Sequence, residues 1–136
     1  FYTVAIGTAR TVEAGDDLSI ITYGMGVHWA MEVAKNHPEI SIDIVDLRTL
    51  APLDTEAIYE SVRKTGKVIV LHEDSLTGGI GGELLSLISE NCFNDLDAPV
   101  KRVGSLDTPI PFINALEDNF LPKKRLVDAV LELYQF

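Results

Sequence analysis

The chain has 136 residues, a length that suits one domain able to bury a core of its own. Its composition is 46% hydrophobic and its formal net charge is −10, which indicates a globular protein and argues against nucleic-acid binding through clustered Lys and Arg. The single cysteine, Cys92, excludes an internal disulfide, and no apolar run reaches the roughly 18 residues that a membrane span needs.

Short β-branched runs alternate with helical periodicity in the first third of the chain. Residues 9–13 are a candidate edge strand, and residues 18–23 form a strand that ends at Gly24. Apolar residues then recur at the i, i+3, i+4, i+7 spacing of one helical face: Val27, Ala30, Met31 and Ala34. Residues 42–47 form the next strand, with apolar side chains on both faces, as in a sheet that is covered on both sides.

A helix over residues 54–65 has sequence signals at both ends. Asp54 suits the N-cap, and Gly66 lies where a helix commonly ends in a left-handed residue. Residues 67–71 then form a third buried strand, which leads into His72-Glu73-Asp74 and a glycine-rich loop. The glycines of this loop are Gly78, Gly79, Gly81 and Gly82.

Two more helices and a strand complete the pattern. A stripe of Leu84, Leu85, Ile88 and Cys92 predicts the helix after the glycines. Residues 99–104 form a short strand, and residues 107–112 form an extended loop that its two prolines stiffen. The last helix begins around Pro122, and its predicted buried face is Leu126, Val127, Val130, Leu131 and Tyr134. Repeated strand–helix units predict parallel pairing, so residues 1–136 are expected to form a single three-layer α/β/α sandwich.

The glycine-rich loop does not match a nucleotide-binding fingerprint. The G-x-G-x-x-G pattern fails when started at Gly79, because position 84 is Leu, and the phosphate loop G-x-x-x-x-G-K-[ST] is absent. These glycines are better explained by close packing of the following helix against the sheet. His72-Glu73-Asp74 is not H-E-x-x-H, and adjacent strand residues point in alternate directions, which argues against a metal site.

The residues reveal no catalytic centre either. There is no G-x-S-x-G nucleophile motif, and Cys92 lies on the apolar stripe of its helix, where packing is the default role. We therefore expect no catalytic, cofactor-binding or metal-binding residues within this chain. This favours a binding or assembly module. The alternative is a free-standing nucleotide-binding or oxidoreductase α/β domain, which the strand–glycine–helix units would suit.

Several stretches, in order, resemble one protein family. They are residues 15–24 (GDDLSIITYG), 46–54 (DLRTLAPLD), His72-Glu73 with residues 79–83 (GIGGE), and 96–111 (LDAPVKRVGSLDTPIP). Together they resemble the C-terminal, transketolase-C-like domain of the β subunit of thiamine-diphosphate-dependent 2-oxo acid dehydrogenases. The second stretch and the His72-Glu73-Asp74 sequence are closer to the branched-chain (2-oxoisovalerate) members than to the pyruvate members.

The resemblance implies a five-stranded, mostly parallel mixed sheet whose first strand is antiparallel. The intact enzymes decarboxylate a 2-oxo acid and transfer the acyl group to lipoamide. Their thiamine diphosphate and Mg²⁺ are held by the α part and by the N-terminal β domain, so none is expected on these residues. The chain begins Phe-Tyr-Thr without Met, and we expect it to be a fragment of a longer protein. The enzyme would be cytoplasmic in a bacterium, or in the mitochondrial matrix of a eukaryote.

The resemblance also implies protein partners. The matched domain pairs with its own copy, accompanies an α subunit or fused α part, and offers a docking surface to the subunit-binding domain of the dihydrolipoyl acyltransferase. The family's docking carboxylates match Asp97 and the α-carboxylate of Phe136. The simpler interpretation is that Asp97 caps a turn before Pro99 and that Phe136 is a frayed chain end. Neither a nucleic acid nor a membrane is expected as a partner.

Overall fold

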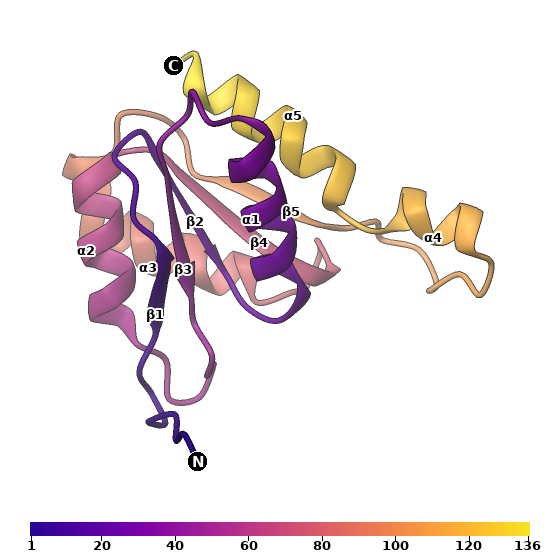
Figure 1. Ribbon diagram of the computed structural model, residues 1–136, viewed down its shortest axis with the longest axis horizontal. Helices are drawn as coiled ribbons and strands as arrows, with labels where there is room; N and C mark the ends of the chain where they lie inside the picture. Colours follow the sequence, from indigo (N-terminus) through magenta and orange to yellow (C-terminus); the bar gives the residue numbers. More distant parts are fainter.

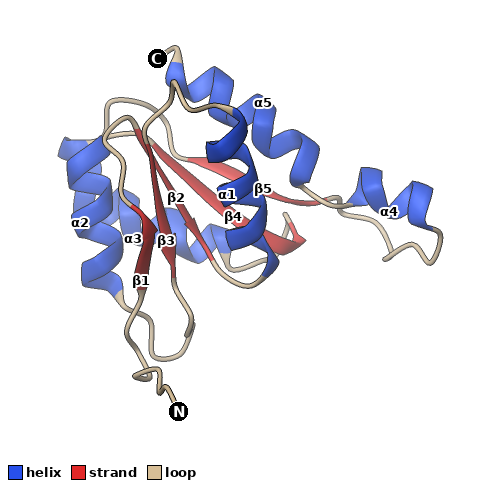
Figure 2. Cartoon of the chain, viewed as in Figure 1, coloured by secondary structure: helices blue, strands red, loops and turns tan.

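The computed structural model describes residues 1–136 as a five-stranded sheet with helices on both faces (Figures 1 and 2). The strands lie in the order β1-β3-β2-β4-β5. They span Arg10–Glu13 (β1), Leu18–Thr22 (β2), Ile42–Asp46 (β3), Val68–Ser75 (β4) and Lys101–Ser105 (β5). Strand β1 pairs with β3 in antiparallel orientation, and the other pairs are parallel. The predicted three-layer sandwich, with its antiparallel first strand, is confirmed.

The helices divide the core into two halves, one on each face of the sheet. They span Met25–Asn36 (α1), Thr55–Thr65 (α2), Gly81–Cys92 (α3), Asn114–Phe120 (α4) and Lys123–Tyr134 (α5), with a 3₁₀ helix at Phe93–Asp95. Helices α1 and α5 cover one face, where Trp29 of α1 is buried in the core, and helices α2 and α3 cover the other. None of these helices has the length and apolar character needed to cross a membrane.

Helix α2 has the predicted ends. The Asp54 side chain accepts a hydrogen bond from the backbone N–H of Ala57 at 3.2 Å, which satisfies a donor in the first turn. Gly66 ends the helix with φ of 67°, and its N–H donates to the carbonyl of Val62 at 2.8 Å. This left-handed end is the conformation for which glycine is favoured.

A buried polar cluster attaches α2 to the sheet. Asp43 of β3 is almost fully buried and accepts hydrogen bonds from the Gly15 N–H at 3.1 Å, the Ser61 hydroxyl at 2.5 Å and Lys64 Nζ at 2.5 Å. Ser19 of β2 joins the same cluster through the Ser61 hydroxyl at 2.7 Å. Because buried polar groups need partners, this cluster fixes how α2 sits on the sheet.

The buried face of α5 was predicted only in part. Leu126 and Val130 are buried as expected, but Leu131 is 37% exposed and Tyr134 is 41% exposed. Leu133 is buried instead, because the face that meets α1 and the sheet follows the 126, 130, 133 spacing. Pro122 stands one residue before the helix rather than in its first turn.

Three differences from the sequence prediction lie beyond the core. Strand β4 continues past Leu71 to Ser75, which pairs with Ser105 after an irregularity in the register, and β5 begins at Lys101 rather than at residue 99. Helix α4 was not predicted: it projects from the sandwich (Figure 1), and only its Phe120 is buried.

The base of this projection is firmly held. Asp107 accepts hydrogen bonds from the backbone N–H of Thr77 at 2.9 Å and from its hydroxyl at 2.6 Å. The guanidinium of Arg125 donates to the carbonyls of Phe120 and Gly104, both at 2.9 Å. The tip of the projection therefore extends from a fixed base.

Candidate docking surface

The glycine-rich loop encloses the ring of His72. This side chain is fully buried at the end of β4. A Cβ atom added to Gly81 would lie 2.5 Å from Nε2, and one added to Gly79 or Gly104 would lie 2.7 or 2.8 Å from Cε1. Side chains at these positions would collide with the ring, so the glycines allow the loop and α3 to close over it. The predicted packing role of the loop is thus visible in its contacts.

His72 is held as a neutral packing residue. Its Nδ1 lies 3.0 Å from the carbonyl of Asp74, and its Nε2 has no hydrogen-bond partner. Burial is the main cause that lowers the pKa of His72, with the nearby Arg102 charge acting in the same direction. The ring therefore packs beneath the loop and is closed off from solvent.

The residues of the loop do not fit a diphosphate with a metal ion. The space beneath the loop is filled by the His72 ring, so no cradle remains for phosphate oxygens. No three His, Cys, Asp or Glu side chains come together in a metal-binding arrangement. Cys92 is buried on α3, and burial raises the pKa of its thiol, which keeps it protonated.

Asp97 lies in the turn between the 3₁₀ helix and β5. Its backbone N–H donates to the carbonyl of Gly66 at 2.8 Å, and a Cβ on Gly66 would lie 2.3 Å from Asp97 Oδ2. The carboxylate therefore rests against the bare Cα of Gly66. Its side chain is exposed and pairs with no lysine or arginine, since Arg63 pairs with Asp95 at 3.9 Å instead. The backbone of Asp97 holds the turn, whereas its carboxylate caps nothing.

Phe136 lies two residues beyond the end of α5. Its N–H donates to the carbonyl of Leu133 at 3.2 Å, and its side chain is 64% exposed. Lys67, the residue after Gly66, donates from Nζ to the carbonyl of Tyr134 at 3.4 Å. The backbone of Asp97 and the carbonyl of Tyr134, the last residue of α5, thus contact two consecutive residues, Gly66 and Lys67, just before β4 begins. Phe136 itself makes neither of these contacts.

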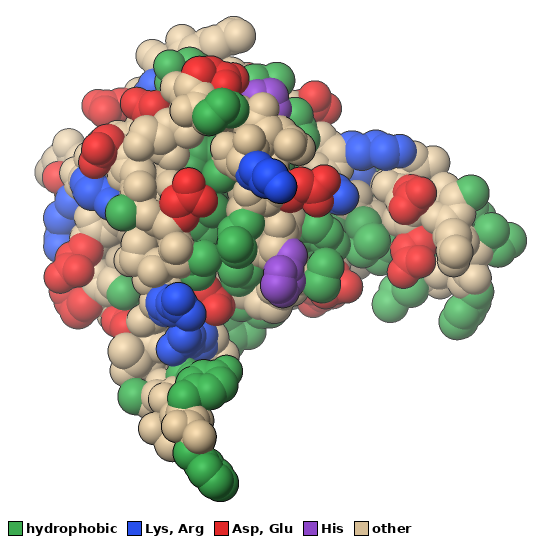
Figure 3. Space-filling view, viewed as in Figure 1, with side chains coloured by type: hydrophobic (Ala, Val, Ile, Leu, Met, Phe, Trp, Pro, Cys, Tyr) green, Lys and Arg blue, Asp and Glu red, His purple; other side chains and the backbone are tan.

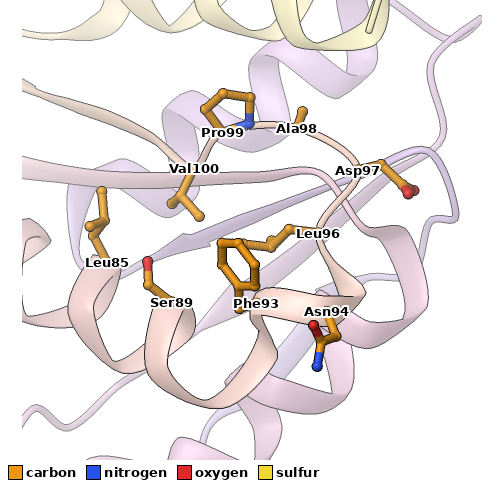
Figure 4. Close-up of a pocket in the computed structure, with 9 residues that line it drawn as sticks. All are labelled: Leu85, Ser89, Phe93, Asn94, Leu96, Asp97, Ala98, Pro99 and Val100. Atoms are coloured by element: carbon orange, nitrogen blue, oxygen red, sulfur yellow. The ribbon is translucent and has the colours of Figure 1, made fainter.

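An apolar groove that was not predicted from the sequence lies beside Asp97. The groove has a volume of about 720 Å³ and lies between α3 and the turn that precedes β5 (Figure 4). Its lining residues are Leu85, Ser89, Phe93, Asn94, Leu96, Asp97, Ala98, Pro99 and Val100. Sequence reasoning missed it because an apolar residue at the rim of a groove has the same local pattern as one in the core.

Apolar side chains are also exposed on two projecting segments. One is the N-terminal segment, where Phe1, Tyr2 and Ile6 are exposed, and the other carries Phe112 and Ile113 before α4. In Figure 3 both projections end in apolar side chains, whereas acidic groups are spread over the body between them. Contiguous exposed apolar groups are typical of surfaces that contact other protein.

Comparison with known proteins finds one matching family model and several similar β subunits. Residues 7–127 match the family model "Transketolase, C-terminal domain". The chain is 43% identical to the 2-oxoisovalerate dehydrogenase subunit beta of Bacillus subtilis, over 99% of this chain and 42% of the relative. It is 37% identical to the pyruvate dehydrogenase E1 component subunit beta of Staphylococcus aureus, again over 99% of this chain and 42% of the relative.

A solved structure resembles the fold over almost the whole chain. It is a split-gene transketolase described as an inactive β4 tetramer, with a TM-score of 0.81 and 29% identity. The match covers 98% of this chain and 43% of the transketolase chain. The present chain therefore spans about two fifths of the length of these relatives.

Proposed function

Because the chain belongs to the family of transketolase C-terminal domains, we propose that it is the C-terminal association domain of a 2-oxo acid dehydrogenase β subunit. The parent enzyme would be a thiamine-diphosphate-dependent oxidoreductase that decarboxylates a 2-oxo acid and passes the acyl group to lipoamide. A 2-oxoisovalerate substrate is favoured over pyruvate, since the identity is 43% to the former relative and 37% to the latter. The cofactor and its Mg²⁺ would lie outside these residues.

The domain would dock onto the subunit-binding domain of the dihydrolipoyl acyltransferase. The observation that supports this proposal is that the exposed carboxylate of Asp97 has no cationic partner, while the turn of Asp97 and the last residue of α5 contact the consecutive residues Gly66 and Lys67. An exposed carboxylate without a partner can form a short, charge-assisted hydrogen bond to Arg or Lys. The net charge of −10 would speed encounter with a basic partner.

Substitution of one carboxylate tests the docking proposal. Asp97→Asn keeps the shape of the side chain and the backbone hydrogen bond to Gly66, but removes the charge. We expect its affinity for the cognate binding domain, measured by calorimetry, to fall by about 2 kcal/mol or more, or roughly 30-fold. Asp95→Asn, two residues earlier, is the matched control and should change affinity little. Unchanged affinity of Asp97→Asn alongside a lowered melting temperature would show that Asp97 only supports the turn.

The same domain would also pair with its own copy. A two-fold contact uses the same patch on both copies, so apolar side chains exposed on one chain can contact their equivalents on the other. Sedimentation at about 100 μM, far above a typical micromolar Kd, should reveal a dimer. A strictly monomeric profile would count against this part of the proposal. The enzyme would further contain an α subunit or a fused α part.

Cofactor titration separates this proposal from a free-standing nucleotide-binding or oxidoreductase domain. The chain should not bind NAD, or thiamine diphosphate with Mg²⁺, with a Kd below about 10 μM, which corresponds to roughly −7 kcal/mol. Binding tighter than this would contradict the assembly role, because the enclosed His72 ring leaves no phosphate cradle in the loop.

A further inference from the structure

The carboxyl ends of β2 and β4 lie at the point where the order of the strands reverses. Strand β2 continues through α1 to β3 on one side, whereas β4 continues through α3 to β5 on the other, and α1 and α3 cover opposite faces of the sheet. In open sheets of this kind, ligands bind outside the carboxyl ends of the strands at such a switch point. The connectivity therefore singles out Tyr23, which follows β2, and residues 73–75 at the end of β4.

A pocket of about 390 Å³ lies at this point, between the end of β4 and the α4 projection. This Tyr23 pocket has an apolar wall of Ile110, Phe120 and Leu121 and a polar side of Tyr23, Glu73, Asp74 and Glu117. Its volume falls within the range of small-molecule sites, and it combines an apolar wall with a few converging polar groups, as such sites do.

The charges of the Tyr23 pocket favour a cation. Glu73, Asp74 and Glu117 form no ion pair, and no lysine or arginine lines the pocket. Their negative charge reaches Tyr23: burial is the main cause that raises the pKa of its hydroxyl, and Asp74 and Glu73 raise it further. A positively charged ligand would neutralise these carboxylates, whereas a diphosphate would be repelled by them.

The apolar wall favours an organic cation over a metal ion. No three His, Cys, Asp or Glu side chains come together in a metal-binding arrangement. A hydrated ion gains nothing from Ile110, Phe120 and Leu121, whereas a hydrocarbon body buries apolar surface against them. The ring of Tyr23 can also attract an ammonium group. We propose that the Tyr23 pocket binds a small organic cation, with an ammonium group at the carboxylates and an apolar body against the wall. This site does not depend on the docking function proposed above.

Three probes of similar shape and different charge test the inference. They are 2-phenylethylamine, which is a cation at pH 7, the neutral 2-phenylethanol and the anion 3-phenylpropanoate. Each is titrated into the 136-residue chain, and binding is followed by the backbone amide shifts in ¹H–¹⁵N NMR spectra. The amine should bind with a Kd of about 1 mM or tighter, as expected for a ligand of this size. It should shift the amides of Tyr23, residues 73–75 and residues 117–121, and the anion should not.

A pair of double variants locates the site. Glu73→Gln with Glu117→Gln removes two charges of the pocket, and neither side chain makes a hydrogen bond or ion pair that the fold would lose. Glu83→Gln with Glu90→Gln is the matched control, because it removes two exposed charges of α3 outside the pocket. We expect the first pair to weaken binding of the amine about tenfold and the control pair to change it less than twofold.

Four results would overturn the inference. They are no saturable shifts with the amine, equal shifts with the anion, equal losses in the two double variants, and tighter binding of a peptide. In the last case a short peptide with one lysine between two leucines would bind at the same amides at least tenfold more tightly than the amine. This result would assign the pocket to a side chain of a protein partner.

Discussion

Replacement of Gly81 by alanine tests why glycines follow β4. A Cβ at this position would lie 2.5 Å from Nε2 and 2.8 Å from Cδ2 of His72. The ring cannot retreat, because Gly79 and Gly104 already pack against its Cε1 atom. The added methyl group must therefore displace either the ring or the first turn of α3. Gly82, the next residue, offers a control, since the heavy atom nearest to its added Cβ is Arg102 Nη1 at 3.8 Å, an ordinary contact.

The magnitude follows from two opposing effects. Overpacking of a closed site costs about 1–3 kcal/mol, and an enclosed ring places Gly81→Ala in the upper part of that range. Alanine recovers at most about 1 kcal/mol of helix propensity at either position. We expect Gly81→Ala to lower the free energy of unfolding by about 1–2 kcal/mol, and Gly82→Ala to leave it unchanged or raise it by up to about 1 kcal/mol.

Urea denaturation followed by the fluorescence of Trp29, the single tryptophan and a buried residue, would measure both variants. A double-mutant cycle with His72→Ala identifies the cause, because the cost of Gly81→Ala should largely vanish once the ring is absent. Equal effects of Gly81→Ala and Gly82→Ala, or a cost that persists without the ring, would refute the packing explanation of the loop.

Three further predictions concern other parts of the domain. Burial lowers the pKa of His72 in the folded state. The contribution of neutral His72 to stability should therefore be complete above the unfolded pKa of about 6.5 and decline as the pH falls toward the folded pKa. In urea titrations at successive pH values, His72→Gln should flatten this decline, and an unchanged pH dependence would exclude His72 as its cause. Asp43→Ala leaves the Ser61 and Lys64 donors without their acceptor and should lower the free energy of unfolding by about 3 kcal/mol or more. Asp46→Ala, which removes a partly exposed ion pair with Arg48 at 3.9 Å, should cost less than about 1 kcal/mol. Asp107→Ala removes the carboxylate that accepts hydrogen bonds from the N–H and the hydroxyl of Thr77. Amide exchange around α4, measured by mass spectrometry, should become faster. Unchanged exchange would show that the contacts of Arg125 and Phe120 are enough to hold the projection.

Elements with strong local signals were predictable from the sequence. Helix α2 has an N-cap at Asp54, a left-handed end at Gly66 and an apolar face between them, so its observed bounds match the prediction closely. Strands β2 and β3 are short β-branched runs whose burial on both faces leaves little choice of register. The antiparallel direction of the first strand was predicted from the resemblance to β subunits, because hydrophobic periodicity does not indicate the direction of a strand.

What the sequence missed depends on contacts between distant residues. The end of β4 is polar, and only its pairing with β5 through Ser75 and Ser105 shows that the strand continues. Helix α4 buries only Phe120, so it lacks the apolar stripe that signals a helix. The turn of Asp97 bonds Gly66, and the end of α5 contacts Lys67, so both contacts join residues far apart in the sequence. No local pattern encodes either contact.

The two edges of the sheet bear on how this domain avoids aggregation. A long, flat, unpaired strand is a template for strand addition and fibril growth. Strand β1 has four residues and a register irregularity between Thr11 and Glu13. At the opposite edge β5 carries Lys101 and Arg102, and the Gly104 carbonyl is occupied by Arg125. Both edges are therefore poor templates for strand addition, which limits edge-to-edge association of a chain that is 46% hydrophobic.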